Sequence, residues 1–135
     1  MSTLPTPNPP VDPAIERYWS AAAEGRLVLP KCNTCGLVIW YPRPFCPDCG
    51  SNDLEWIDSE GTGSVYSCTV TRRGQGAYRD AAPYVLAYVE LDEGPRVLTN
   101  IVDCDPDAVA IGDRVVALFD PVPDADAGLL RFRPA

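Results

Sequence analysis

Four cysteines in the first half of the chain have the spacing of a metal site. They form two C-x2-C pairs separated by ten residues, and a glycine directly follows each pair: Cys32, Cys35, Gly36, Cys46, Cys49 and Gly50. In each C-x-x-C-G segment, backbone amides can point at thiolate sulfur while glycine adopts the left-handed conformation that turns the chain away. Four thiolates bind zinc tetrahedrally and leave no open position for catalysis. The spacing therefore predicts one structural zinc ion per chain.

Disulfides and a redox-active C-x-x-C pair are alternatives, because the chain has six cysteines, an even number. Neither is favoured, since no secretion signal accompanies the cysteines and a redox pair needs only one C-x-x-C, usually at the start of a helix. Iron in the same thiolate cage is a further alternative. The other two cysteines, Cys68 and Cys104, lie in strand-like patterns. We expect them to be small buried side chains rather than ligands or nucleophiles.

The absence of histidine limits the catalytic chemistry of the chain. Without imidazole there is no Ser-His or Cys-His nucleophile pair and no usual proton shuttle at neutral pH. An independent hydratase or thioesterase would have to use carboxylates, and the spacing of Glu90, Asp92 and Glu93 is that of a solvated turn. We therefore predict no catalytic residue.

The elements that must hold these cysteines begin with an N-terminal helix. Residues 1–11 contain four prolines and few bulky side chains, which predicts a flexible, solvated arm. Residues 12–25 then carry a helix pattern, with an Asp-Pro start, a terminal glycine and apolar side chains at i, i+3, i+4 and i+7: Ile15, Tyr18, Trp19 and Ala22. This aromatic face must dock on its own domain or on another chain.

The rest of the chain predicts two small β units. Residues 26–58 have short apolar pieces broken by the cysteine pairs, and a unit of this size needs metal to supply folding free energy. Residues 59–135 contain five strand-like runs, at 64–72, 83–91, 96–104, 114–122 and 129–135. Five short strands avoid exposed edges by closing into a barrel. The fold class is therefore mainly β: an N-terminal helix, a rubredoxin-like zinc ribbon and a five-stranded OB-fold barrel.

The charge balance indicates which partners are disfavoured. The formal net charge is -8, and four thiolates holding one dication would add a further -2. Nucleic acid would therefore meet a repulsive field. No apolar run is long enough to span a bilayer, and the N-terminus has no targeting signal, so we expect a cytoplasmic protein without a membrane partner.

Segments covering about residues 15 to 135 carry a family resemblance. They are YWSAAAEGRLVLPKCNTCG, YPRPFCPDCGS, EGTGSVYSCTV, PYVLAYVELDEGPRVLTNIVD and the final FRPA. Together they resemble the acyl-CoA-associated zinc-ribbon OB-fold proteins. Members of that family partner thiolases, archaeal 3-hydroxy-3-methylglutaryl-CoA synthase and lipid-transfer-protein-type steroid aldolases, or are fused to hotdog-fold hydratases.

The resemblance implies a non-catalytic accessory subunit in a hetero-oligomer. Such a subunit binds acyl-CoA thioesters and completes the active site of a thiolase-superfamily partner that makes or breaks carbon-carbon bonds. Thiolysis, condensation and retro-aldol cleavage all stay open, as do steroid side-chain and aromatic acid degradation. The alternative is a nucleic-acid-binding protein, because zinc ribbons and OB barrels both occur in that role. An OB-fold barrel that binds nucleic acid should interleave aromatic residues with Lys and Arg on its strand faces. In this chain, the runs at 64–70 and 84–91 instead alternate Tyr with Cys, Leu and Glu.

A CoA ligand needs guanidinium groups for its phosphates and a stacking surface for its adenine. The densest positive cluster surrounds the glycine-flanked segment 74–76 and gives the candidate residues Arg72, Arg73, Tyr78 and Arg79. Its alternative role is a solvated hairpin tip. Lys31 and Arg43, beside the cysteine pairs, are second-tier candidates for the same phosphates.

Five aromatic side chains concentrate in the first 56 residues: Trp19, Trp40, Tyr41, Phe45 and Trp56. Exposed aromatics at this density are typical of a protein interface. Alternatively, they wrap the zinc site and seal the ribbon against the barrel. The first interpretation predicts a chain that is stabilised by its partner.

Overall fold

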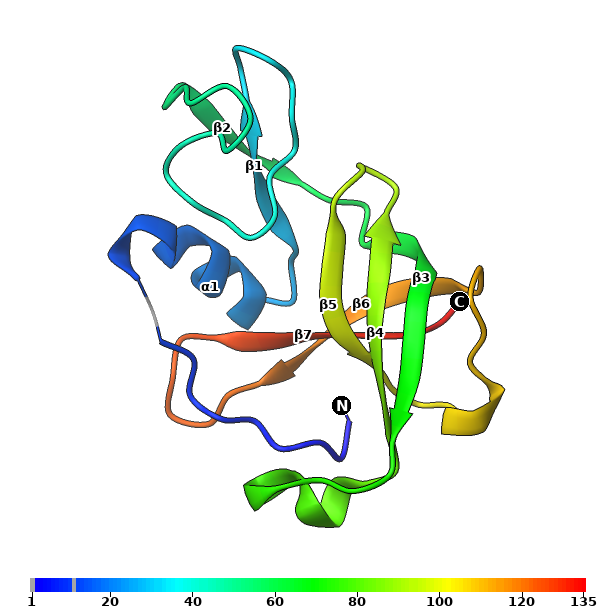
Figure 1. The fold of residues 1–135 in the computed structure, drawn as a ribbon. Helices are drawn as coiled ribbons and strands as arrows, with labels where there is room; N and C mark the ends of the chain where they lie inside the picture. The colour runs from blue at the N-terminus through cyan, green and yellow to red at the C-terminus, as the bar shows by residue number, and fades with distance from the viewer. Residues whose placement is uncertain (1, 11) are drawn as a thin grey trace.

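The computed structural model describes residues 2–10 and 12–135. Figure 1 shows three parts: a short helix, a two-stranded ribbon and a closed barrel of five strands. The fold is mainly β, as the sequence predicts. Within the described residues, no helix has both the length and the apolar character needed to cross a membrane.

The N-terminal helix forms where its capping pattern predicts. A 3-10 turn, η1 (Pro13–Ile15), leads into α1 (Glu16–Ala23), and the Asp12 side chain accepts a hydrogen bond from the Ala14 N–H at 2.9 Å. The four side chains of the predicted apolar face are all buried: Ile15, Tyr18, Trp19 and Ala22. Ile15 and Trp19 pack on the β6–β7 hairpin, so this face docks on the chain's own barrel.

The ribbon consists of β1 (Val28–Cys32) and β2 (Leu54–Asp58), paired antiparallel with Val28 opposite Asp58 and Cys32 opposite Leu54. The loop between these strands carries the remaining cysteines. Leu27 and Leu29 belong to the same buried cluster as the barrel core. The ribbon is therefore joined to the barrel by shared apolar packing, as well as by the chain itself.

The barrel contains the five strands that the sequence predicts. They are β3 (Thr62–Thr71), β4 (Tyr84–Leu91), β5 (Arg96–Ile101), β6 (Arg114–Pro121) and β7 (Gly128–Pro134), closed in the order β3-β4-β5-β7-β6. The β5–β7 contact is parallel and the other pairs are antiparallel. Two 3-10 turns, η2 (Gly76–Ala81) and η3 (Pro106–Ala108), follow β3 and β5.

The barrel interior is filled by alternating strand residues. Along β4, Val85, Ala87, Val89 and Leu91 are buried and the residues between them face outward. Phe132 on β7 is fully buried at the centre of the same cluster. Cys68 and Cys104 are half-buried and pack against this cluster. They follow the other four cysteines in the sequence and lie outside the ribbon.

A buried ion pair links strands β6 and β7. The side chains of Asp120 and Arg131 are 2% and 7% exposed, and Arg131 Nε lies 3.2 Å from Asp120 Oδ2. Arg131 also donates to Asn100 Oδ1 at 2.6 Å and to the Pro5 carbonyl at 2.9 Å. Although burial raises the pKa of Asp120, hydrogen bonds from Ser2 and Arg131 outweigh it and lower that pKa overall. The pair is therefore compensated by a full hydrogen-bond network.

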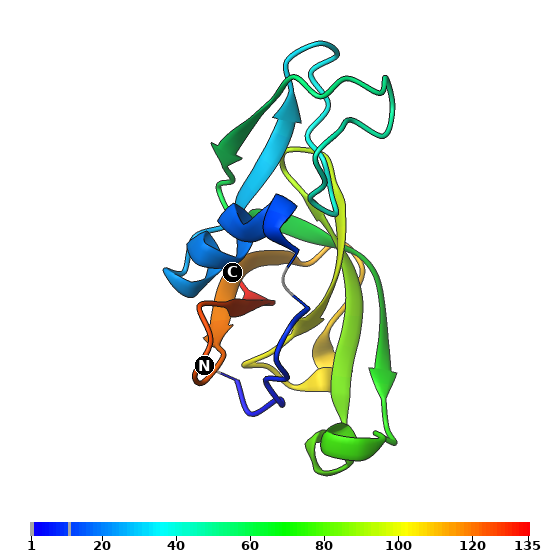
Figure 2. The same cartoon turned by 90° about the vertical axis from the view of Figure 1, so that its left-hand side faces the viewer.

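The first residues of the chain differ from the solvated arm that the sequence predicts. The Ser2 N–H donates to Asp120 Oδ1 at 2.8 Å, Leu4 is buried, and the Pro5 carbonyl accepts from Arg131. Figure 2 shows this segment running along the barrel below α1. Proline-rich composition does not reveal such contacts, because the Pro5 carbonyl is an acceptor for an arginine far along the chain. Residues 1 and 11 of the predicted arm lie outside the described part.

Candidate functional site

The four predicted metal ligands come together in the ribbon. Cys32 Sγ lies 3.6 Å from Cys49 Sγ, Cys35 Sγ lies 3.6 Å from Cys46 Sγ, and all four sulfur atoms lie within 4.8 Å of one another. A disulfide would require about 2.05 Å. Zinc-sulfur bonds of about 2.3 Å in a tetrahedron place sulfur atoms roughly 3.8 Å apart. The cluster therefore fits a tetrathiolate zinc site and not a pair of disulfides.

Two equivalent backbone turns position these sulfur atoms. The Gly36 N–H donates to the Cys32 carbonyl at 2.8 Å, and the Gly50 N–H donates to the Cys46 carbonyl at 2.9 Å. Gly36 and Gly50 have φ angles of 81° and 78°, the left-handed conformation that the sequence predicts for them. Each pair of ligands is thus held by one tight turn.

The four clustered thiols can all ionise only if a cation compensates their charge. Backbone N–H groups of Cys35 and Thr34 lower the pKa of the Cys32 thiol to about 6, in spite of desolvation. The Leu37 N–H also favours the Cys35 thiolate, but desolvation and the neighbouring thiols together raise the pKa of Cys35 to about 12. Four thiolates cannot share so small a volume unless a positive charge compensates them. A divalent ion supplies that charge, so the residues present fit zinc.

The aromatic side chains of the first 56 residues divide into two groups. Tyr18 stacks on Trp19 with ring centroids 5.0 Å apart and meets Trp40 at 5.6 Å, which packs the helix against the ribbon. Burial raises the pKa of Tyr18 well above its usual range. Tyr41 and Phe45 are 39% and 49% exposed, and Trp56 is half-buried. Sealing the ribbon therefore accounts for Trp19 and Trp40, while Tyr41 and Phe45 are left at the surface.

The first-tier candidates for CoA binding lie together beyond the end of β3. Arg72 and Arg73 follow the strand, and Tyr78 and Arg79 belong to η2, where the Tyr78 ring lies 5.7 Å from that of Tyr84. The three arginines are exposed. Arg72 Nη2 lies 2.5 Å from Asp107 Oδ1, and no ion pair involves Arg73 or Arg79 in the part of the chain that the structure describes. This loop can offer two free guanidinium groups.

The second-tier candidates lie elsewhere. Lys31 is a half-buried residue of β1, and Arg43 lies in the ribbon loop, where its Nε donates to the Tyr41 carbonyl at 3.0 Å. Figures 1 and 2 both place the ribbon and η2 at opposite ends of the molecule. The six predicted residues therefore form two separate groups and not one site.

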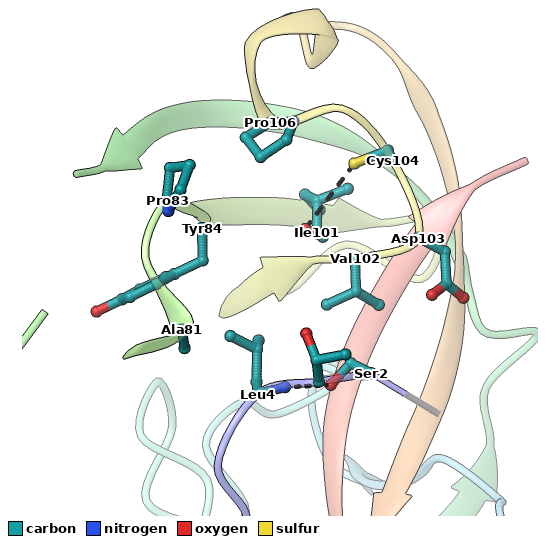
Figure 3. Close-up of a pocket in the computed structure, with 11 residues that line it drawn as sticks. Ser2, Leu4, Ala81, Pro83, Tyr84, Ile101, Val102, Asp103, Cys104 and Pro106 are labelled. Atoms are coloured by element: carbon teal, nitrogen blue, oxygen red, sulfur yellow. Dashed lines mark hydrogen bonds between the residues drawn. The ribbon is translucent and has the colours of Figure 1, made fainter. Parts of the chain in front are cut away.

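A hollow of about 250 Å³ lies beside the η2 loop, and sequence reasoning missed it. Figure 3 shows Leu4 of the N-terminal segment on one side and Tyr84, Val102 and Cys104 around it. No lysine or arginine lines this hollow, and Asp103 is its one charged lining residue. An uncharged group suits it better than a phosphate. Because one wall comes from residues 2–4, no local sequence signal could have revealed it.

The three carboxylates of the predicted solvated turn are engaged in structural bonds. Asp92 pairs with Arg114 at 2.8 Å, and hydrogen bonds from Arg114 and Thr62 lower the pKa of Asp92 to about 2. Glu90 pairs with Arg96 at 3.0 Å, and Glu93 accepts from the Ser59 hydroxyl at 2.8 Å. These carboxylates therefore stabilise the β4–β5 hairpin and its neighbours.

Comparisons with known proteins agree with this architecture. Residues 19–55 match the rubredoxin-like zinc ribbon domain of ChsH2, and residues 56–120 match the C-terminal OB-fold domain of ChsH2. A DUF35 domain-containing scaffold protein of Methanothermobacter thermautotrophicus is 44% identical over 93 residues, covering 68% of this chain and 70% of the relative. A probable enoyl-CoA hydratase alpha subunit of Thermomonospora curvata is 41% identical over 127 residues, covering 91% of this chain. This chain spans only 39% of that subunit.

A solved structure described as an Ltp2-ChsH2(DUF35) aldolase superimposes on the chain with a TM-score of 0.81. The two sequences are 37% identical, and the match covers 94% of this chain and 98% of the other. The cysteine-containing ribbon and the barrel thus both fall within the matched region. The chain therefore belongs to the ChsH2 family of DUF35 proteins, which join a zinc ribbon to an OB-fold barrel.

Proposed function

We propose that this chain is a non-catalytic accessory subunit that binds acyl-CoA thioesters and completes the active site of a thiolase-superfamily partner. The observation that carries the proposal is the likeness, over nearly the whole chain, to the ChsH2 component of an aldolase complex. The relative from Thermomonospora curvata is itself described as a probable enoyl-CoA hydratase alpha subunit. The partner would make or break the carbon-carbon bond, by thiolysis, condensation or retro-aldol cleavage, and the acyl group stays open.

The metal has a structural role in this proposal. Cys32, Cys35, Cys46 and Cys49 would hold zinc, whose chemical contribution is to cross-link the two turns of the ribbon. Four thiolates fill the coordination sphere, so substrate does not reach the ion. The ribbon would present a rigid surface next to the barrel, and the chain's own residues would contribute binding and positioning.

The loop after β3 is the proposed contact for the CoA phosphates. Arg73 and Arg79 are exposed and have no carboxylate partner in the described residues, which suits bidentate phosphate contacts. Arg72 would exchange its exposed partner Asp107 for a phosphate, at small cost because solvent screens such a pair. Tyr78 would offer its ring for stacking. Lys31 and Arg43, at the other end of the molecule, would at most contact a second ligand group or the partner.

The first experiment tests the partnership. The tagged chain is co-expressed with the thiolase-fold subunits encoded in its own genome, and polypeptides that co-purify are identified by mass. The proposal expects recovery of one such subunit in a stable complex. Recovery of none by a folded, zinc-loaded chain would overturn it. An electrophoretic shift with single-stranded nucleic acid at physiological salt tests the alternative function, and a shift would favour it.

The second experiment tests the phosphate contacts in that complex. The double variant Arg73→Ala/Arg79→Ala should weaken the affinity for an acyl-CoA by about 1–3 kcal/mol, because charge-assisted hydrogen bonds are lost. Arg17→Ala serves as the matched control, because Arg17 is an exposed arginine on α1. Equal affinity for the double variant and the control would remove the loop from the CoA site.

A further inference from the structure

The outer face of strands β3, β4 and β5 carries several exposed apolar side chains. Four large side chains on it are exposed, by 48% for Tyr66, 38% for Leu86, 45% for Tyr88 and 52% for Leu98. Tyr88 lies opposite Ser67 on one side and Leu98 on the other, and Leu86 is the next outward residue of β4. We refer to these four residues as the Tyr88 face. Figure 1 looks onto this sheet, and Figure 2 shows it edge-on at the margin of the molecule.

The Tyr88 face is hollowed at its centre. A shallow depression of about 210 Å³ lies between Leu86, Tyr88, Leu98 and residues 67–69 of β3. Its lining is mainly apolar, and no charged residue contributes to it. Such a depression suits one bulky apolar side chain from another molecule, which is how the central residues of protein interfaces are typically seated.

One ion pair borders the Tyr88 face. Arg96 Nε lies 3.0 Å from Glu90 Oε2, and the Arg96 guanidinium carbon lies 3.9 Å above the centre of the Tyr66 ring. This part of the edge therefore carries a compensated ion pair, while the chain as a whole carries -8. An apolar centre with a neutral polar rim is typical of a surface that binds protein.

The net charge of the chain favours a different protein, rather than a second copy of this chain, as the molecule that covers the Tyr88 face. Two copies would bring together two bodies of charge -8 each, and zinc binding by four thiolates makes each more negative. That repulsion opposes self-association through a face whose arginine, Arg96, is already paired with Glu90. A partner of lower negative charge, with a bulky apolar side chain for the depression, meets no such penalty.

We propose that the Tyr88 face docks the enzyme subunit that this chain serves, with an apolar side chain of that subunit seated between Leu86, Tyr88 and Leu98. The inference rests on the proposed function, and it adds the surface through which the partnership is made. Docking is thereby assigned to the barrel and not to the ribbon, where Tyr41 and Phe45 are also exposed.

The test uses the thiolase-fold subunit recovered in the partnership experiment and measures its dissociation constant with the zinc-loaded chain. Leu98→Asp places a charge at the centre of the proposed interface and should raise the dissociation constant about tenfold or more. Phe45→Asp is the matched control, because Phe45 is 49% exposed and lies on the ribbon. Zinc content and thermal midpoint of both variants are measured first. If Leu98→Asp does not fold, Leu98→Thr is used as the test variant instead, because threonine favours the strand conformation.

The outcomes separate the inference from the function on which it rests. Loss of affinity for Leu98→Asp, with Phe45→Asp binding like the unsubstituted chain, supports the inference. Unchanged binding of the Leu98 variant, or weakening by Phe45→Asp alone, overturns it while the partnership stands. Sedimentation of the isolated chain as a dimer that Leu98→Asp dissociates would show that a second copy covers the face. If the unsubstituted chain binds no such subunit, the proposed function falls and the inference falls with it.

Discussion

Removing the Asp120 carboxylate tests the buried network most sharply. Asp120→Ala leaves the Arg131 guanidinium, whose side chain is 7% exposed, without its counter-ion. Breaking a buried ion pair in this way costs about 3–5 kcal/mol. Because Arg131 keeps Asn100 Oδ1 and the Pro5 carbonyl as acceptors, we expect the lower end of that range. A loss of about 3 kcal/mol lowers the thermal midpoint by roughly 10 °C for a domain of this size.

Calorimetry of the zinc-loaded chain measures this effect. Asp92→Ala is the control, because Asp92 also pairs with an arginine but at the surface, with its side chain 44% exposed. We expect a much smaller change for the control. The double variant Asp120→Leu/Arg131→Met should recover most of the lost stability, since no buried charge is left unpaired. Equal midpoints for Asp120→Ala and Asp92→Ala would show that the buried ion pair contributes no more to stability than the exposed one.

Three further predictions follow from single contacts. Removing zinc with a chelator should unfold the ribbon and leave the barrel strands more protected than residues 28–58 in hydrogen exchange; uniform protection without metal would contradict a structural zinc site. Gly128→Ala should destabilise the helix docking by about 1–3 kcal/mol, because a Cβ there would lie 2.5 Å from the Ala22 carbonyl oxygen; urea unfolding measures it, and no change in midpoint would contradict the close approach. The Asp92–Arg114 pair should contribute fully to the free energy of unfolding above about pH 4, and this contribution should be lost as the pH falls toward 2, because the pKa of Asp92 is lowered to about 2 in the folded state. Asp92→Asn should therefore flatten the dependence of the free energy of unfolding on pH in that window. Identical slopes for the variant and the unsubstituted chain would exclude the pair as the source of that dependence.

The metal site and the strands could be predicted because their signals are local. The two C-x-x-C-G segments each specify one tight turn, so the quartet follows from the spacing of Cys32, Cys35, Cys46 and Cys49. The helix face of Ile15, Tyr18, Trp19 and Ala22 likewise follows from its period, and all four side chains are buried.

What the sequence could not reveal depends on pairing between distant segments. The run at 84–91 is apolar on both of its faces except at Glu90, so alternation alone does not say that Leu86 and Tyr88 face solvent. The pairing of β4 with β3 and β5 determines which of its faces is turned to solvent. The bond from Ser2 to Asp120 spans 118 residues, and the ion pair of Arg72 with Asp107 spans 35. No composition or motif predicts contacts of that kind.

Reconstitution of the partner's reaction is the direct test of the proposed accessory role. The purified thiolase-fold subunit is assayed for cleavage or condensation of an acyl-CoA, alone and with the zinc-loaded chain added back. We expect this chain alone to form no product, the partner alone to be slow, and the two together to restore the rate in proportion to the complex formed. Turnover of the thioester by this chain alone, or an equal partner rate with and without it, would exclude the accessory role.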